Sequence, residues 1–151
     1  MSMSMEELRQ QLSAIEPDER TYRGIGSEEV PLLRRLLDDE ERWLAARAVF
    51  ALSRVGSSEA YSALEAAAED QREEVRVAVA AASTSLPIDT SDALLERLLN
   101  DQSSGVRRFA IESVSERNGL RIRTRLQDIA SADTDPYLRL LAQQQEARLR
   151  P

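Results

Sequence analysis

The chain has 151 residues, a length that suits one compact domain, and 42% of its residues are hydrophobic while 31% are charged. It contains 5 Gly and 5 Pro, too few for a collagen-like, proline-rich or broadly disordered protein. The basic residues are 20 Arg, against 27 Asp and Glu, so the net charge is −7. Because this charge repels phosphate backbones, we expect no nucleic-acid partner.

The chain contains no His, Cys or Lys. These absences exclude an imidazole base, a thiolate nucleophile, a Schiff base and the usual zinc, haem or iron–sulfur ligands. Only carboxylate pairs, hydroxyls activated by carboxylates, or a carboxylate-bound Mg or Ca ion remain for catalysis. We therefore predict that the protein is not an enzyme and that it has no catalytic, cofactor-binding or metal-binding residues.

The first residues, Met1 to Glu7, include two acidic side chains and no apolar core, unlike a signal or transit peptide. No stretch approaches 18 apolar residues. We expect a cytoplasmic protein with no membrane partner. The use of Arg without Lys suggests a GC-rich bacterial genome.

The first predicted element is an amphipathic helix over residues 5–16, with Leu8, Leu12 and Ile15 on one face and Pro17 just beyond it. A short helix is expected near residues 18–23. Together, residues 4–26 are predicted to cover the end of the hydrophobic core that follows.

Four helix pairs are predicted next, because the chain repeats itself at a nearly constant interval. Apolar helical segments begin at anchors separated by 31, 31 and 32 residues: Leu44, Val75, Val106 and Leu138. Another apolar helix precedes each anchor. Each repeat is therefore a helical hairpin, with boundaries at about 27–56, 57–88, 89–118 and 119–150. With the N-terminal cap, the repeats make residues 1–151 a single domain.

An aspartate stands five residues before each anchor, at positions Asp39, Asp70, Asp101 and Asp133. An arginine follows three of the anchors directly, at Arg76, Arg107 and Arg139, whereas Ala45 breaks the pattern in the first repeat. Residues that return every 31 positions serve each repeat, which argues against catalysis. We interpret them as a structural ladder, in which Asp caps the N–H groups of a turn and Arg bridges to a carboxylate of the next repeat.

The pattern of Asp, a polar turn, Val-Arg-x-x-Ala-x-x-Ala-Leu and then Gly resembles the HEAT repeat, especially the compact HEAT-like repeats of phycobilisome lyases. Leu44 to Gly56 shows it best, apart from Ala45. The resemblance covers residues 28–150 and implies an all-α, right-handed α-solenoid of antiparallel helix pairs. Gly56 and Asn118-Gly119 are predicted to close helices, and Asp135-Pro136 to open the last one.

Helical geometry places part of each second helix opposite the core stripe, and in solenoids that this chain resembles these helices line the concave side. Phe50 and Val77 are apolar there, where solvent is expected. The predicted partner-binding residues are Phe50, Arg47, Arg54, Val77, Arg108, Phe109, Glu112 and Trp43. Two structural alternatives stay open: Phe50 could fold against Arg47 or Arg54, and Trp43 could cover the end of the core, as Tyr137 occupies the equivalent position in the last repeat.

These observations favour a non-enzymatic scaffold, adaptor or small regulatory protein of the immunity or inhibitor type, with a partner protein on its concave face. We expect a monomer or a weak homodimer. The alternative implied by the resemblance is an enzyme or enzyme subunit, similar to a bilin lyase or isomerase or, less favoured, to a DNA glycosylase.

Overall fold

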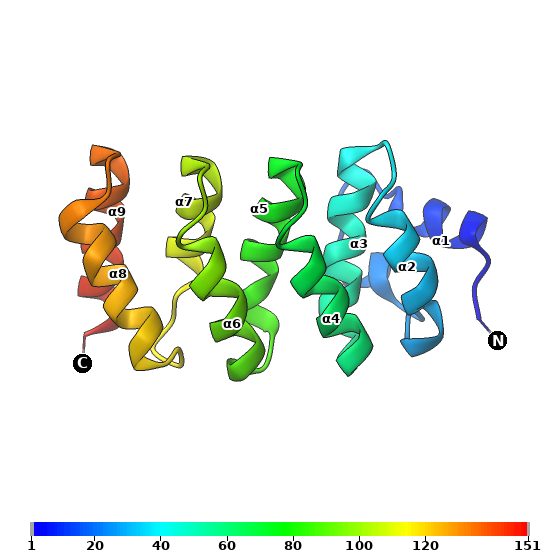
Figure 1. The fold of residues 1–151 in the computed structure, drawn as a ribbon. Helices are drawn as coiled ribbons and strands as arrows, with labels where there is room; N and C mark the ends of the chain where they lie inside the picture. The colour runs from blue at the N-terminus through cyan, green and yellow to red at the C-terminus, as the bar shows by residue number, and fades with distance from the viewer. Residues whose placement is uncertain (1, 151) are drawn as a thin grey trace. The chain divides into compact units, whose positions relative to one another are not determined.

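The computed structural model describes residues 2–150, and all regular structure within that range is helical. The helices follow one another through short turns (Figure 1). Their bounds are α1 Met5–Leu12, η1 Glu19–Tyr22, η2 Ser27–Glu29, α2 Val30–Leu36, α3 Arg42–Val55, α4 Ser58–Ala67, α5 Glu73–Ala82, η3 Ser83–Ser85, α6 Ile88–Leu98, α7 Ser104–Ser113, α8 Leu120–Ala132 and α9 Pro136–Leu149.

The chain divides into two compact units, which are described separately below. Unit 1 extends to Val79 and unit 2 begins at Ala80, so the division falls within α5. In unit 1, α2 packs against α3, and both pack against α4. In unit 2, α6 lies beside α8 and α7 lies beside α9, so the first and second helices of consecutive pairs stack on their counterparts (Figure 1). This stacking is the arrangement predicted for repeated helix pairs.

The core of unit 1 is built from leucines and small residues that recur on one face of each helix. Leu33 and Leu36 of α2 and Leu64 of α4 are fully buried, and the buried alanines of α3 let neighbouring helices approach closely. The N-terminal helix α1 packs on α3 and buries its own two leucines. Each of these leucines contributes about 1.5–3 kcal/mol through burial. The principal buried side chains are Leu8, Leu12, Leu33, Leu36, Leu44, Leu52 and Leu64.

The core of unit 2 follows the same pattern and also contains isoleucine. Helix α6 buries two adjacent leucine pairs, one turn apart, and α7 and α9 each bury their anchor residue and the alanine four positions later. The principal buried side chains are Leu94, Leu95, Leu98, Leu99, Val106, Ala110, Ile111, Leu126, Leu138 and Ala142. The 31- to 32-residue periodicity of the sequence therefore corresponds to the packing periodicity of the helices.

Several helix ends agree with the sequence, and two do not. Gly56 closes α3 in the left-handed conformation, with φ 77°, and Asp135 caps α9 by accepting the Tyr137 N–H at 2.9 Å. Gly119, in contrast, has φ −70° and precedes α8, because α7 already ends at Ser113. The predicted first helix is also too long: α1 stops at Leu12, and Ile15 is 95% exposed.

In the part of the chain that the structure describes, no helix combines the length and the apolar character that a membrane span requires.

Candidate functional site

The recurring aspartates all make the same turn. In each repeat one carboxylate oxygen accepts the backbone N–H two residues later, which orders the turn between the two helices of a pair. The four distances are 2.9 Å from Asp39 to Glu41, 2.8 Å from Asp70 to Arg72, 2.9 Å from Asp101 to Ser103 and 2.9 Å from Asp133 to Asp135. A backbone requirement of each turn therefore accounts for the recurrence of Asp.

The recurring arginines close the same turns from the other side. Each guanidinium reaches back six residues and donates from Nη1 to the carbonyl of the aspartate, at 2.8 Å for Arg76, 2.9 Å for Arg107 and 2.6 Å for Arg139. Arg107 also spans two repeats, because its Nε and Nη2 donate to the Asp133 carboxylate at 3.0 and 3.1 Å. Burial of that carboxylate would raise its pKa, but the Arg107 hydrogen bonds and the Asp135 N–H hold the pKa below its usual value.

The first repeat lacks this arginine and uses two others that sequence reasoning missed. Arg9 of α1 pairs with the Asp39 carboxylate, whose pKa is lowered by the Glu41 N–H and by this arginine. Arg72 donates to the carbonyls of Leu37 and Asp39, the latter at 2.6 Å. Neither arginine recurs at the repeat interval, so periodicity gave no signal for them.

An apolar groove lies in unit 1 between α3 and the N-terminal segment. It encloses about 490 Å³, within the range typical of binding pockets. One wall is a face of α3, whose lining residues follow one another at intervals of three or four positions. The other wall is the segment around η1. The lining residues are Pro17, Asp18, Glu19, Tyr22, Trp43, Ala46, Arg47, Phe50 and Arg54.

The aromatic side chains of the groove are incompletely buried. Trp43 is 46% exposed, and its indole N–H donates to Glu41 Oε2 at 2.9 Å, so the polar atom is satisfied while much of the ring remains accessible. Phe50 and Tyr22 are half-buried, and burial raises the pKa of the Tyr22 hydroxyl. Aromatic rings that are preorganised and partly exposed are a recurrent component of interaction hot spots.

The two groove arginines hold the N-terminal segment against α3. Arg47 donates to the carbonyls of Leu12 and Ala14, the first at 2.6 Å, and lies 5.5 Å from the Trp43 ring centroid. Arg54 pairs with Glu19 at 2.8 Å, lowering the pKa of that carboxyl, and stacks 4.2 Å from the Tyr22 ring centroid. Their donors are thus engaged within the chain, and both residues position the walls of the groove.

The other predicted partner-binding residues are not brought into this groove. Val77 is half-buried and lies outside the groove lining. Arg108 and Glu112 of α7 form an exposed pair at 3.1 Å in unit 2. The Arg108 guanidinium lies 5.8 Å from the Phe109 ring centroid and 5.9 Å from that of Tyr137, which is 54% exposed. The sequence prediction therefore corresponds to two separate clusters, one in each unit.

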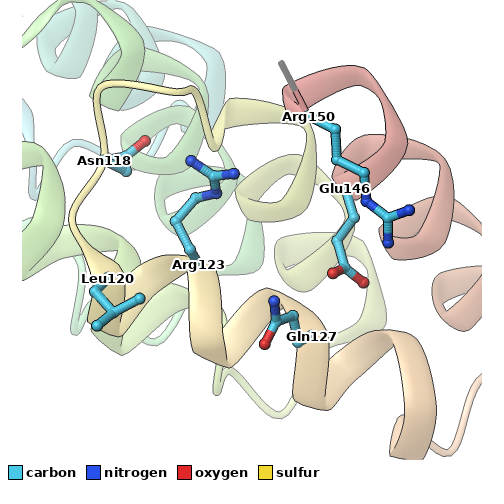
Figure 2. A pocket seen from close by; sticks show the side chains of 6 residues that line it. All are labelled: Asn118, Leu120, Arg123, Gln127, Glu146 and Arg150. Carbon is cyan, nitrogen blue, oxygen red and sulfur yellow. The ribbon is translucent and has the colours of Figure 1, made fainter.

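Unit 2 also contains a polar pocket that sequence reasoning did not predict. It encloses about 370 Å³ and lies between the loop before α8, the first half of α8 and the end of α9 (Figure 2). Arg123 projects from α8 into the space between the loop and α9, whereas Gln127 and Glu146 face each other across the opening. The lining residues are Asn118, Leu120, Arg123, Gln127, Glu146 and Arg150.

Among residues 2–150, no three acidic side chains converge as possible metal ligands. The acidic turn around Asp38 to Glu40 also contains Arg42 and Arg72, which neutralise part of its charge.

Helix pairs recur every 31 or 32 residues, and each pair is closed by its own aspartate turn. Residues 20–85 match the family described as HEAT repeats, which confirms the resemblance predicted from the sequence. The chain is also similar to a solved structure, that of the complex of CpcE and CpcF of phycocyanin lyase from Nostoc sp. PCC7120. That match has 20% identity and a TM-score of 0.69, and covers 94% of this chain and 97% of the other. No curated protein matches the chain.

This likeness confirms the predicted all-α solenoid of antiparallel helix pairs. It also corrects the prediction that the protein is not an enzyme. That prediction rested on the absence of His, Cys and Lys, yet the same fold occurs in the complex of a phycocyanin lyase. The missing residue types exclude particular chemistries from this chain, but they do not separate it from enzymes or enzyme subunits.

Proposed function

We propose that the protein binds a partner protein and that the groove between η1 and α3 is its binding site. The main support for this proposal is the groove itself, where the rings of Trp43, Phe50 and Tyr22 are partly exposed. An apolar centre with a polar rim is the usual form of a protein interface. Such a site suits an adaptor, a scaffold or a small regulator.

The charges around the groove indicate the character of the partner. Asp18 and Glu19 are exposed at its rim, and each pairs with an arginine of the chain, Asp18 with Arg20 and Glu19 with Arg54. Unit 1 carries 10 Arg against 17 Asp and Glu. We therefore expect a partner segment that inserts an apolar side chain between the rings and carries basic residues beside it.

The proposal can be tested with Trp43, the one tryptophan of the chain. Proteins captured from a native lysate by the wild type would be compared with those captured by Phe50→Asp and by Tyr137→Ala. Phe50→Asp places a charge in the groove, while Tyr137→Ala removes an exposed aromatic residue from unit 2 and serves as the matched control. A partner of the groove should be lost only with Phe50→Asp, and its purified form should shift Trp43 fluorescence.

A partner that binds the wild type and Phe50→Asp equally would contradict the proposal. Circular-dichroism melts of both variants would show that the fold is retained.

A second candidate function is a subunit of an enzyme, which the similarity to the phycocyanin lyase complex favours. In that case the chain, alone or with a partner subunit, should change the absorbance spectrum of an added bilin. The same Phe50→Asp variant distinguishes a role of the groove in that change from a role elsewhere on the chain.

A further inference from the structure

We propose that the polar pocket of unit 2 is a site for a single carboxylate, presented by an acidic residue of a peptide segment. The pocket is formed by Arg123 and Gln127 of α8, Glu146 of α9, Arg150 directly after α9, and the loop at Asn118 and Leu120 (Figure 2). It lies in unit 2, so the inference is independent of the proposed groove in unit 1.

The unpaired state of Arg123 is the first argument. A partly buried guanidinium is costly to desolvate unless its donors have acceptors. Three other half-buried arginines have them: Arg47 binds two carbonyls, Arg72 pairs with Asp70, and Arg107 pairs with Asp133. Arg125, on the same helix as Arg123, has no hydrogen-bond partner at its buried Nε and does not line the pocket. Among the described residues, no acceptor contacts the Arg123 guanidinium, although the residue is half-buried and lines a cavity; its backbone N–H donates to Gly119 at 3.1 Å. An acceptor from another molecule would satisfy it.

The net charge of the pocket indicates which anionic group would bind Arg123. Arg123 and Arg150 bring two positive charges, and Glu146 brings one negative charge, so the lining has a net charge of +1. A carboxylate, with one negative charge, balances this net charge, whereas a phosphate with nearly two negative charges would leave the occupied pocket with a net negative charge. The planar guanidinium of Arg123 also matches the two oxygens of a carboxylate.

The remaining lining residues fit a peptide that carries this carboxylate. Glu146 and the Gln127 side-chain oxygen can accept backbone N–H groups of an extended segment. Leu120, which is 82% exposed, offers an apolar contact at the rim. A volume of about 370 Å³ holds more than one carboxylate group, which leaves room for the adjoining peptide.

The test uses the full chain and blocked peptides, each with an acetylated N-terminus and an amidated C-terminus. One peptide has Glu at its centre and the matched peptide has Gln there. Binding is followed by the backbone amide NMR signals of residues 118–127. The Glu peptide should shift these signals, and Arg123→Gln should weaken its binding by roughly tenfold or more, the loss expected for one charge-assisted ion pair. Arg150→Gln should weaken it by a smaller factor.

Arg117→Gln is the matched control, because it removes the same charge nearby from an exposed residue that does not line the pocket. If Arg117→Gln and Arg123→Gln weakened binding of the Glu peptide equally, the effect would come from the overall charge of the protein, and the proposed site would be wrong. Equal binding of the Gln peptide, or equal shifts with inorganic phosphate, would overturn the carboxylate assignment. Shifts with sodium acetate as strong as those with the Glu peptide would overturn the role of the peptide.

Discussion

The two units contain the same repeat, but they differ in net charge and in the residues next to the first helix pair of unit 1 and in the last helix pair of unit 2. Unit 1 contains 10 Arg and 17 Asp or Glu, whereas unit 2 contains 10 of each, so the whole net charge of −7 belongs to unit 1. In unit 1 an added segment, α1 and η1, covers α3 and leaves an aromatic groove.

In unit 2, the α8–α9 pair carries polar residues at positions where the preceding helix pair has buried apolar ones. Thirty-two residues after the buried Leu95, Ile111 and Val114 of the third repeat stand Gln127, Gln143 and Glu146. Two of these residues line the polar pocket. The comparison shows that one repeat design yields two unlike recognition surfaces, because the surfaces arise where the repeat pattern is interrupted.

The largest expected effect concerns the pair that joins consecutive repeats of unit 2. The Arg107 and Asp133 side chains are 13% and 5% exposed. Removing one partner leaves a buried charge, so Arg107→Met should lower the free energy of unfolding by about 3 kcal/mol. Urea titration followed by circular dichroism measures this change. Arg108→Met, which breaks an exposed pair on the same helix, should cost less than about 0.5 kcal/mol.

The corresponding pair in unit 1, Arg9 with Asp39, is more exposed. Arg9→Met should therefore cost about 1 kcal/mol or less. A loss as large as that of Arg107→Met would break the contrast between the two units.

A further effect is expected for the pH dependence of stability. The pKa of Asp133 is lower in the folded state than in the unfolded chain. Its contribution is therefore fully present above the unfolded pKa of about 3.9 and is lost as the pH falls through the folded value. Asp133→Asn should be less stable at pH 7 but should lose less further stability on acidification. Parallel stability curves for the two proteins between neutral and acidic pH would contradict this assignment.

The smallest effect on stability is expected at the groove. Arg54→Gln breaks an exposed ion pair with Glu19 and the stacking on Tyr22, so the denaturation midpoint should stay within error of the wild type. The N-terminal wall should nevertheless loosen, and acrylamide should then quench Trp43 fluorescence more strongly. Unchanged quenching would show that Arg54 does not position this wall.

The repeated features of the molecule could be predicted from its sequence, and the unrepeated ones could not. Periodic leucines and alanines predict the helix pairs, and the recurring Asp39, Asp70, Asp101 and Asp133 all lie in equivalent turns. The role of Arg72 in the first repeat was missed because its acceptors there are the backbone carbonyls of Leu37 and Asp39, which leave no trace in the pattern of side chains. Phe50 was singled out because it is apolar on a helix face where solvent is expected, and it lines the groove together with Trp43.

The remaining errors come from tertiary contacts. The apolar spacing that reaches Ile15 predicts a longer first helix, but the Arg47 guanidinium binds the carbonyls of Leu12 and Ala14, where α1 has ended. Gly119 resembles a helix terminator in sequence, yet its N–H donates to Asp92 of α6, and it opens the next helix instead. Neither partner is adjacent in the chain, so local patterns could not reveal it.

The way each repeat closes its own turn has a consequence for the growth of such chains. Three residues that close one turn lie within one repeat of about 31 residues. They are Asp101, Ser103, whose N–H donates to the Asp101 carboxylate, and Arg107, which donates to the Asp101 carbonyl. A tandem duplication of that repeat would bring its own turn, its own cap and a new acceptor for the preceding arginine. Gene duplication can therefore add repeats without changes in the neighbouring ones. New binding surfaces would then arise in the first or last repeat, or where a repeat departs from the consensus.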